Sequence, residues 1–146
     1  MTGAVRRAQR VDVDDLRSLE SEARMSVQDE RGGAQMLADG GSWNLPDRVR
    51  SGEGLVLVAT IDDVPLGFVS VILRRPDLAV IEALYVVEGA RGVGLGEGLM
   101  DEALVWCRQQ GARAVDSLAL PGARATKNFY EAHGIVARAI VVSRRL

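Results

Sequence analysis

Residues 91–98 read RGVGLGEG, and they form the part of the sequence that is best suited to bind an anion. Glycines let a backbone approach a ligand closely, because no Cβ atom stands in the way. Apolar residues at helical spacing follow and predict a helix that begins at this loop: Leu95, Leu99, Ala103 and Trp106. The first N–H groups of a helix lack partners within the helix, and its dipole favours negative charge there. A pyrophosphate would suit this site, with a charge-assisted contact from Arg91.

Three phosphate-binding patterns compete for this loop, and the sequence excludes two of them. A P-loop needs a lysine followed by serine or threonine, whereas a leucine follows the last glycine here and the only lysine lies far downstream. The dinucleotide-binding pattern G-x-G-x-x-G would need its third glycine at Glu97 or at Leu99. The pattern that fits is R-x-x-G-x-G, formed by Arg91, Gly94 and Gly96.

With this pattern the sequence resembles the GNAT superfamily of N-acetyltransferases. Upstream, residues 81–86 (IEALYV) look like the central strand of that family, which splays from its neighbour to admit pantetheine. Downstream, residues 128–135 (NFYEAHGI) are similar to its closing helix and tyrosine, and residues 6–8 and 14–15 also look typical. Three ordered segments carry the resemblance, whereas a short glycine pattern alone would also fit a tight turn between a strand and a helix.

The resemblance implies transfer of an acetyl group from acetyl-CoA to a primary amine, through a tetrahedral intermediate. It assigns hydrogen bonds with the pantetheine arm and the thioester carbonyl to the backbone of Leu84, Tyr85 and Val86. It assigns further cofactor binding to the loop residues Arg91, Gly92, Val93, Gly94, Leu95 and Gly96. The asparagine of the family would fall at Ala123, so Asn128 is expected to take its place.

Tyr130 is the candidate that would stabilise the departing thiolate, since the resemblance places it beside the thioester sulfur. Moving a proton from a phenol of pKa about 10 to a thiolate of pKa about 8.5 is uphill by roughly 2 kcal/mol. A strong hydrogen bond is therefore as reasonable as full protonation. The alternative is that Tyr130 only packs against the sheet, as Phe129 next to it would.

Glu82 is the candidate base for the acceptor amine, of which only about one molecule in 10³ is neutral at pH 7. It interrupts an apolar strand, and alternation predicts that it shares a face with Val80, Leu84 and Val86. The alternative is that its carboxylate simply meets solvent at a strand end. Asp116 on the next predicted strand is a weaker candidate, and an ordered water could serve either carboxylate.

Periodicity and turn residues predict the elements that must position these groups. Strands are predicted at residues 5–8, 55–61, 66–73, 78–87, 114–120 and 135–143, with a hairpin turn at 62–65. Helices are predicted after Asp12 as an N-cap, from Leu95 to a C-cap at Gly111, and at 124–133. Residues 25–50 are expected to form short helices and loops. This order indicates an α/β fold, a GNAT-like central mixed sheet flanked by helices.

The C-terminus is expected to leave one sheet edge open. Only a dozen residues follow Gly134, enough for one strand, so the seventh strand usual in the family is expected to be missing. An open edge can pair with another subunit, and this favours a homodimer.

Composition limits the remaining classes of function. The 146 residues predict a single domain, 1–146, and the net charge of −2 argues against nucleic acid as the main partner. Apolar runs are too short for a membrane span and no signal segment is present, so a soluble protein without a membrane partner is expected. One cysteine and one histidine alone cannot build a Cys/His metal site, so no metal is expected. A single cysteine cannot form an internal disulfide and favours a reducing compartment, the cytoplasm.

The acceptor itself is not readable from the sequence. By the resemblance it would be a small-molecule or peptide amine, met largely by residues 25–50. A different class of function remains open beside the enzyme: a non-catalytic acyl-CoA-binding or regulatory module that has kept the glycine loop.

Overall fold

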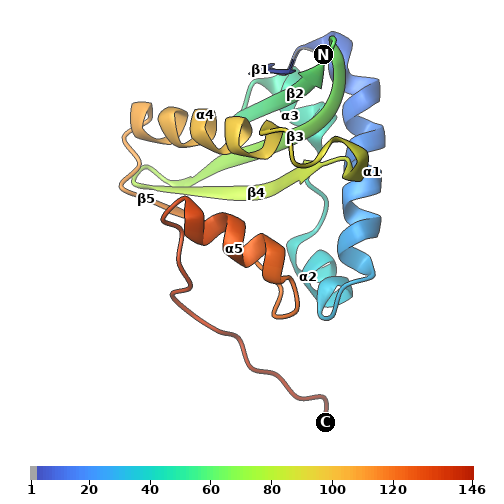
Figure 1. Cartoon of the computed structure of the whole chain (residues 1–146). Coiled ribbons are helices and arrows are strands. Elements are labelled where there is room, and N and C mark those ends of the chain that lie inside the picture. Colours follow the sequence, from blue (N-terminus) through green and yellow to red (C-terminus); the bar gives the residue numbers. More distant parts are fainter. Residues whose placement is uncertain (1–2) are drawn as a thin grey trace.

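The computed structural model describes residues 3–146, which form a mixed β-sheet between two layers of helices (Figure 1). The strands follow one another in chain order across the sheet: β1 (Gly3–Arg7), β2 (Leu55–Ile61), β3 (Val64–Arg75), β4 (Leu78–Val86) and β5 (Ala114–Asp116). The first four strands pair antiparallel, and β4 pairs parallel with β5. The predicted α/β fold with a mixed sheet is confirmed.

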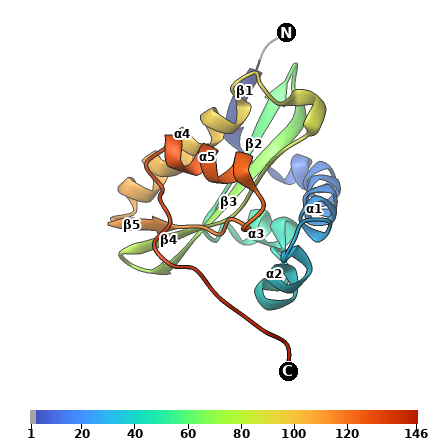
Figure 2. The same ribbon diagram turned by 60° about the horizontal axis from the view of Figure 1, so that its bottom comes forward.

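The helices divide between the two faces of the sheet (Figure 2). One face is covered by α1 (Val13–Gln28) and α3 (Leu45–Ser51), with the short helix α2 (Gly33–Gly40) between them in the chain. The other face is covered by α4 (Leu95–Gln109) and α5 (Arg124–Ala132). Two 3-10 turns, η1 (Arg10–Asp12) and η2 (Glu88–Ala90), precede α1 and the glycine loop.

Each face has its own apolar core. On the α1 side, Leu16 and Leu45 are fully buried against Val58 and Phe68 of the sheet. On the α4 side the core takes the predicted helix face together with sheet residues: Leu95, Leu99, Met100, Ala103, Cys107, Val69, Val71 and Ile81. Burying one such aliphatic side chain contributes about 1.5–3 kcal/mol, so both helical layers are held against the sheet.

Asp12 directly precedes α1 as predicted, but its carboxylate does not cap the helix. It accepts two hydrogen bonds from the Arg6 guanidinium, at 2.7 and 2.8 Å, and one from the Gln9 backbone N–H. Asp12 therefore links β1 to the start of α1, and the Arg6 contact holds the pKa of its carboxyl below the usual value.

The C-terminal strands are where the prediction was wrong. The strand predicted at residues 114–120 ends at Asp116, and the strand predicted at 135–143 does not form; this segment leaves the body of the protein as an extended tail (Figure 1). Its apolar, β-branched composition is typical of a strand, but a strand also needs a neighbour to pair with. Within the described residues 3–146, no strand takes that place beside β5.

Candidate active site

The strands β4 and β5 separate at the centre of the sheet. Their ladder joins Leu78–Val80 to Ala114–Asp116 and stops there. From residue 81 to its end at Val86, β4 has β3 on one side and no strand of the described chain on the other. The resemblance assigned binding of pantetheine to the backbone of Leu84, Tyr85 and Val86, and these residues lie on this unpaired stretch.

Ser117 stands where the two strands part. Its Oγ lies 3.0 Å from the carbonyl oxygen of Ile81, to which it donates, and 2.8 Å from the hydroxyl of Tyr130. A serine hydroxyl has a single proton, so in this pair Tyr130 donates and Ser117 accepts. The sequence analysis did not single out Ser117; its only signal was a polar residue inside a predicted strand.

Tyr130 comes from α5 and is buried in the core on the α4 side of the sheet. Burial raises the pKa of its phenol, while the hydrogen bond with Ser117 acts in the opposite direction. The hydroxyl is thus held in its protonated form and close to the point where β4 and β5 separate. Asn128, also on α5, is exposed.

The glycine loop connects β4 to α4 through two residues in the left-handed region. Gly92 has φ +83° and Gly94 has φ +86°, and α4 begins at Leu95 with no side-chain cap on its first N–H groups. A Cβ atom at either glycine would meet nothing of the protein within 4 Å. The space beside this loop is therefore open to a ligand, and the free N–H groups favour an anion there.

Arg91 is anchored at the start of this loop. Its Nε donates to the carbonyl oxygen of Val86 at 2.8 Å, and its guanidinium lies 5.6 Å from the centre of the Tyr85 ring. Within the part of the chain that the structure describes, this is its one hydrogen bond, so its terminal amino groups retain donors for an anion. Val93 is exposed, and Gly96 faces the ring of Phe129 on α5.

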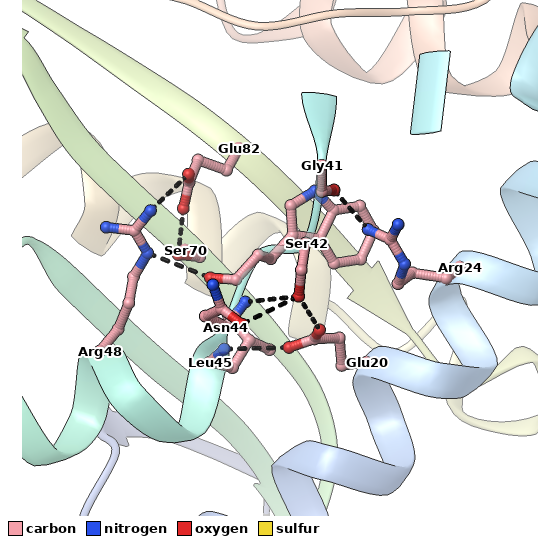
Figure 3. A network of polar contacts seen from close by, with 10 residues as sticks. Glu20, Arg24, Gly41, Ser42, Asn44, Leu45, Arg48, Ser70 and Glu82 are labelled. Carbon is pink, nitrogen blue, oxygen red and sulfur yellow. Dashed lines mark hydrogen bonds and ion pairs between the residues drawn. The ribbon is translucent and has the colours of Figure 1, made fainter. Parts of the chain in front are cut away.

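Glu82 lies at a β-bulge, and the bulge changes the face of the sheet to which its side chain points. Ser70 pairs with Ala83 and Val71 pairs with Ile81, so Glu82 is the extra residue of β4. Its carboxylate reaches Arg48 of α3 at 2.7 Å and accepts from Ser70 at 3.0 Å (Figure 3). The predicted shared face with Leu84 and Val86 is wrong, because these two pack on the α4 side whereas Glu82 points to the layer of α1 and α3.

The charge state of Glu82 depends on three neighbours. Burial is the main effect and raises the pKa of its carboxyl. The positive charge of Arg48 and the hydrogen bonds from Ser70 and Arg48 oppose this, and the negative charge of Glu20 on α1 adds to the rise. Glu82 is therefore a carboxylate whose basicity is raised by burial and moderated by its salt bridge with α3.

The segment that leads into α3 belongs to the same polar network (Figure 3). Arg48 also donates to the carbonyl oxygen of Trp43 at 3.2 Å, and Glu20 accepts from the Leu45 N–H at 2.9 Å. Arg24 of α1 donates to the Gly41 carbonyl and lies 5.1 Å from the centre of the Trp43 ring. Residues 41–48 lie within the segment that the resemblance assigned to the acceptor, and they are tied to Glu82 through Arg48.

The Asp116 carboxylate forms an ion pair of its own, with a residue that follows α5. Its carboxylate pairs with Arg138, which holds the pKa of Asp116 below its usual value. A carboxylate with a lowered pKa is a poorer base, so the geometry favours Glu82 over Asp116. The structure does not bring Glu82 and Tyr130 together on one face. Tyr130 lies on the α4 side of the sheet beside Ser117, whereas the Glu82 carboxylate lies on the α1 and α3 side against Arg48 and Ser70.

The described residues contain neither a candidate metal site nor a candidate membrane-spanning helix. Among residues 3–146, no three or more His, Cys, Asp or Glu side chains come together in a way that could hold a metal ion. No helix in that part of the chain is long and apolar enough to span a membrane.

Comparison with known proteins points to one family. The family model described as Acetyltransferase (GNAT) family matches residues 13–135. No curated protein sequence matches the chain.

Solved structures share the fold at low sequence identity. An aminoglycoside N-acetyltransferase, AAC(6')-Iy, in complex with a bisubstrate analogue of CoA, is 18% identical with a TM-score of 0.72, over 100% of both chains. The PaiA N-acetyltransferase of Thermoplasma acidophilum, in complex with coenzyme A, is 18% identical with a TM-score of 0.73, over 91% of this chain and 89% of that one. A ribosomal-protein-alanine N-acetyltransferase from Brucella melitensis is 16% identical with a TM-score of 0.67, over 99% and 98%. Since the family model covers most of the sequence, from the first residue of α1 to three residues beyond α5, the chain belongs to the GNAT family of acetyltransferases.

Proposed function

We propose that this protein transfers the acetyl group of acetyl-CoA directly to a primary amine. The observation that carries the proposal is the unpaired stretch of β4, residues 81–86, which runs into the open glycine loop and the uncapped start of α4. An extended pantetheine arm needs an unpaired backbone, and a pyrophosphate needs free N–H groups. Here the two features are consecutive in the chain, and Arg91 is held between them by Val86.

The parts of acetyl-CoA fit the residues in order. The pyrophosphate would accept hydrogen bonds from the backbone of residues 92–96 and meet the charge of Arg91. The pantetheine arm would follow Leu84, Tyr85 and Val86, where a backbone N–H could stabilise the oxyanion of the tetrahedral intermediate. Asn128, exposed on α5, would meet the cofactor from the far side of the gap.

Glu82 and Tyr130 would handle the protons. Glu82 takes a proton from the acceptor ammonium, directly or through a water, so that the amine nitrogen can attack the thioester carbon. After the attack the nitrogen still carries a second proton to lose, and it gives this proton to water. The bond between carbon and sulfur then breaks, and its electron pair leaves on the sulfur. Tyr130 then donates a hydrogen bond to that thiolate, for which its hydroxyl must turn away from Ser117.

The proposed acceptor is a primary amine on a small molecule or peptide, and the structure does not narrow this class further. The structural neighbours are named for different acceptors, an aminoglycoside and a ribosomal protein among them, so the fold does not choose one. A shallow groove of about 370 Å³, lined by residues of α1 and the start of α3, lies on the same side of the sheet as Glu82. A cytoplasmic location and the absence of a metal stay predictions from the sequence.

One observation favours a second candidate, a binding or regulatory module without turnover. Glu82 is already paired with Arg48, and the Tyr130 hydroxyl is already given to Ser117. Both groups would have to exchange partners before catalysis. In a module that only binds acyl-CoA, these contacts would simply hold α3 against β4 and α5 against the residue that follows β5.

Thermal unfolding with and without acetyl-CoA tests the binding site first. At 100 times its dissociation constant a ligand adds about 2.7 kcal/mol, which raises the Tm of a domain of this size by roughly 5–10 °C. Absence of a shift at millimolar acetyl-CoA would contradict the assignment of the cofactor site.

Replacing Tyr130 by Phe then separates the two candidates. If the protein is an enzyme, thiol release in the presence of amine acceptors should fall by about 10–150-fold, because a hydrogen bond to a charged group contributes about 1.5–3 kcal/mol. The Tm shift with acetyl-CoA should persist, because the ring still fills its buried site. If the unchanged protein binds acetyl-CoA but releases no thiol with any amine tested, the result would support the binding module and not the enzyme.

A further inference from the structure

The Ser117 hydroxyl links β4 to the phenol of Tyr130 at the point where β4 and β5 separate. Its oxygen lies 3.0 Å from the carbonyl oxygen of Ile81 and 2.8 Å from the hydroxyl oxygen of Tyr130. Ile81 is the first residue of β4 beyond the ladder with β5, and Ser117 is the first residue after β5. The hydroxyl that must reach a departing sulfur therefore starts in a hydrogen bond with Ser117.

Both partners of this hydrogen bond are held in place by the fold. Asp116, directly before Ser117, pairs with Val80 in the ladder and with Arg138 by its side chain. Tyr130 is buried in the core on the α4 side of the sheet. The heavy atoms are thus fixed, and a change in the pattern of hydrogen bonds needs only rotation of the two O–H groups.

The single proton of Ser117 can serve either of its neighbours. It now points to the carbonyl oxygen of Ile81, while the serine oxygen accepts the proton of Tyr130. Once Tyr130 donates to a thiolate, Ser117 can turn its own proton to the phenol oxygen. The Ile81 carbonyl then faces the unpaired edge of β4, where a water or an amide of pantetheine can donate to it. No bond to hydrogen breaks in this exchange.

The reversed hydrogen bond would make Tyr130 a stronger donor. In a chain of hydrogen bonds each bond polarises the next, so a phenol that accepts one also donates a stronger one. Burial acts against donation, because it raises the pKa of the Tyr130 phenol, whereas the hydrogen bond with Ser117 lowers that pKa. Ser117 therefore offsets part of the effect of burial.

We propose that Ser117 is a positioning residue, which directs the Tyr130 hydroxyl to the thioester sulfur and donates a hydrogen bond to the phenol oxygen as the thiolate leaves. The chain of donors runs from Ser117 through Tyr130 to the sulfur. The inference rests on the proposed function, because it needs a departing thiolate. The opposite role would be a restraint, in which Ser117 competes with the sulfur for the proton of Tyr130.

Replacement of Ser117 by Ala distinguishes these two roles. The kcat for thiol release from acetyl-CoA should fall by about 2–12-fold, the net effect of one neutral hydrogen bond, while the KM for acetyl-CoA stays the same. Ser117→Thr keeps the hydroxyl and should restore kcat. The amines in this assay are an aminoglycoside, a diamine and a peptide that begins with alanine. A kcat that rises in Ser117→Ala would identify Ser117 as a restraint and overturn the proposal.

The same substitution in a Tyr130→Phe background shows whether Ser117 acts through Tyr130. Without the phenol oxygen, Ser117→Ala should lower kcat no further. An equal loss in both backgrounds would mean that Ser117 only holds β4 and β5 together, which would overturn the proposal. If the unchanged protein releases no thiol, the proposed function fails together with this inference. If Ser117→Ala is as fast as the unchanged protein, this inference fails alone.

Fluorine NMR tests the hydrogen bond without turnover. The sequence has two tyrosines, Tyr85 and Tyr130, so the protein labelled with 3-fluorotyrosine should give two signals, which Tyr85→Phe assigns. Fluorination makes the phenol more acidic, and this brings its titration to milder pH. The signal of residue 130 should titrate at higher pH in Ser117→Ala than in the unchanged protein or in Ser117→Thr. The signal of Tyr85, whose partner is Glu22, is the internal control. An unchanged titration of residue 130 in Ser117→Ala would overturn the proposal.

Discussion

Burial favours the proposed role of Glu82 as a base but disfavours proton donation by Tyr130. Burial raises the pKa of both groups. For the carboxylate this brings its pKa towards neutral pH, where a base is most effective. For the phenol it makes proton donation to a thiolate still more unfavourable than the roughly 2 kcal/mol of the unperturbed groups. We therefore expect Tyr130 to act by hydrogen bonding and Glu82 to act by true proton transfer.

The pH dependence of Glu82 should respond to Arg48. Arg48 lowers the pKa of the Glu82 carboxyl, so Arg48→Gln should raise that pKa further. A base works only when deprotonated; the acidic limb of the kcat/KM profile should therefore move to higher pH. Activity should fall most at acidic pH, by no more than the roughly 10²–10⁴-fold that a general base contributes, and should recover as the pH rises.

Arg50→Gln is the control for this measurement, because Arg50 lies on the same helix and, among residues 3–146, pairs only with the exposed Asp47. Its pH profile should match that of the unchanged protein. Arg48→Lys should move the acidic limb of the kcat/KM profile less than Arg48→Gln does, since lysine keeps the positive charge. A profile that keeps its acidic limb in Arg48→Gln would mean that Glu82 is not the titrating base.

The sequence pointed to Glu82 and Tyr130, but it could not supply their partners. Arg48 lies 34 residues before Glu82 in a segment without clear periodicity, and Ser117 is an ordinary polar residue directly after the short strand β5. The direction of Glu82 was also out of reach, because a bulge depends on the register of two strands and not on either strand alone.

At the scale of elements, the glycines at the two ends of α4 have the same backbone conformation, so the effect of a substitution can be compared between them. Gly94 before the helix and Gly111 after it both have φ +86°, and a Cβ at either would meet no atom within 4 Å. Gly94→Ala and Gly111→Ala should each lower the free energy of unfolding by about 1 kcal/mol, since alanine resists the left-handed region. Only Gly94→Ala should weaken acetyl-CoA binding, by at least about tenfold, because its Cβ would occupy the space where the pyrophosphate is proposed to sit.

Calorimetric titration with acetyl-CoA and chemical denaturation measure the two effects separately. Equal losses of binding in both variants would show that backbone strain, and not the ligand, explains the glycine at position 94. Equal stability losses with unchanged binding in both would remove the loop from the cofactor site.

Most elements could be predicted because local sequence decides them. The apolar spacing of Leu95, Leu99 and Ala103 fixed the buried face of α4, and residues 62–63 marked the hairpin turn, although the turn is tighter than predicted because Val64 and Pro65 belong to β3. The short β5 and the unpaired tail could not be predicted in this way. Whether a β-prone segment becomes a strand depends on the presence of a neighbour, which periodicity does not report.

At the scale of the whole molecule, the sheet has one weak seam. β3 and β4 pair along nearly their whole length, whereas β4 and β5 share only a short ladder at Leu78–Val80, with Ser117 as an added link. The β5 and α5 side is therefore expected to open locally more easily than the rest of the fold. Acetyl-CoA bound along β4 would contact both sides of this seam, so an opening of the seam would destroy its site.

Hydrogen exchange should reveal this coupling. A ligand that binds only the closed form suppresses an opening by a factor of one plus its concentration over its dissociation constant. At 100 times that constant, amides of β5 and α5 should exchange about 100-fold more slowly. The fraying ends of α1 should be unaffected, because their opening leaves the seam closed, and α1 is thus the internal control. Slowing confined to the glycine loop, with α5 unchanged, would mean that the cofactor binds without bridging the seam, and that Tyr130 does not lie beside the thioester.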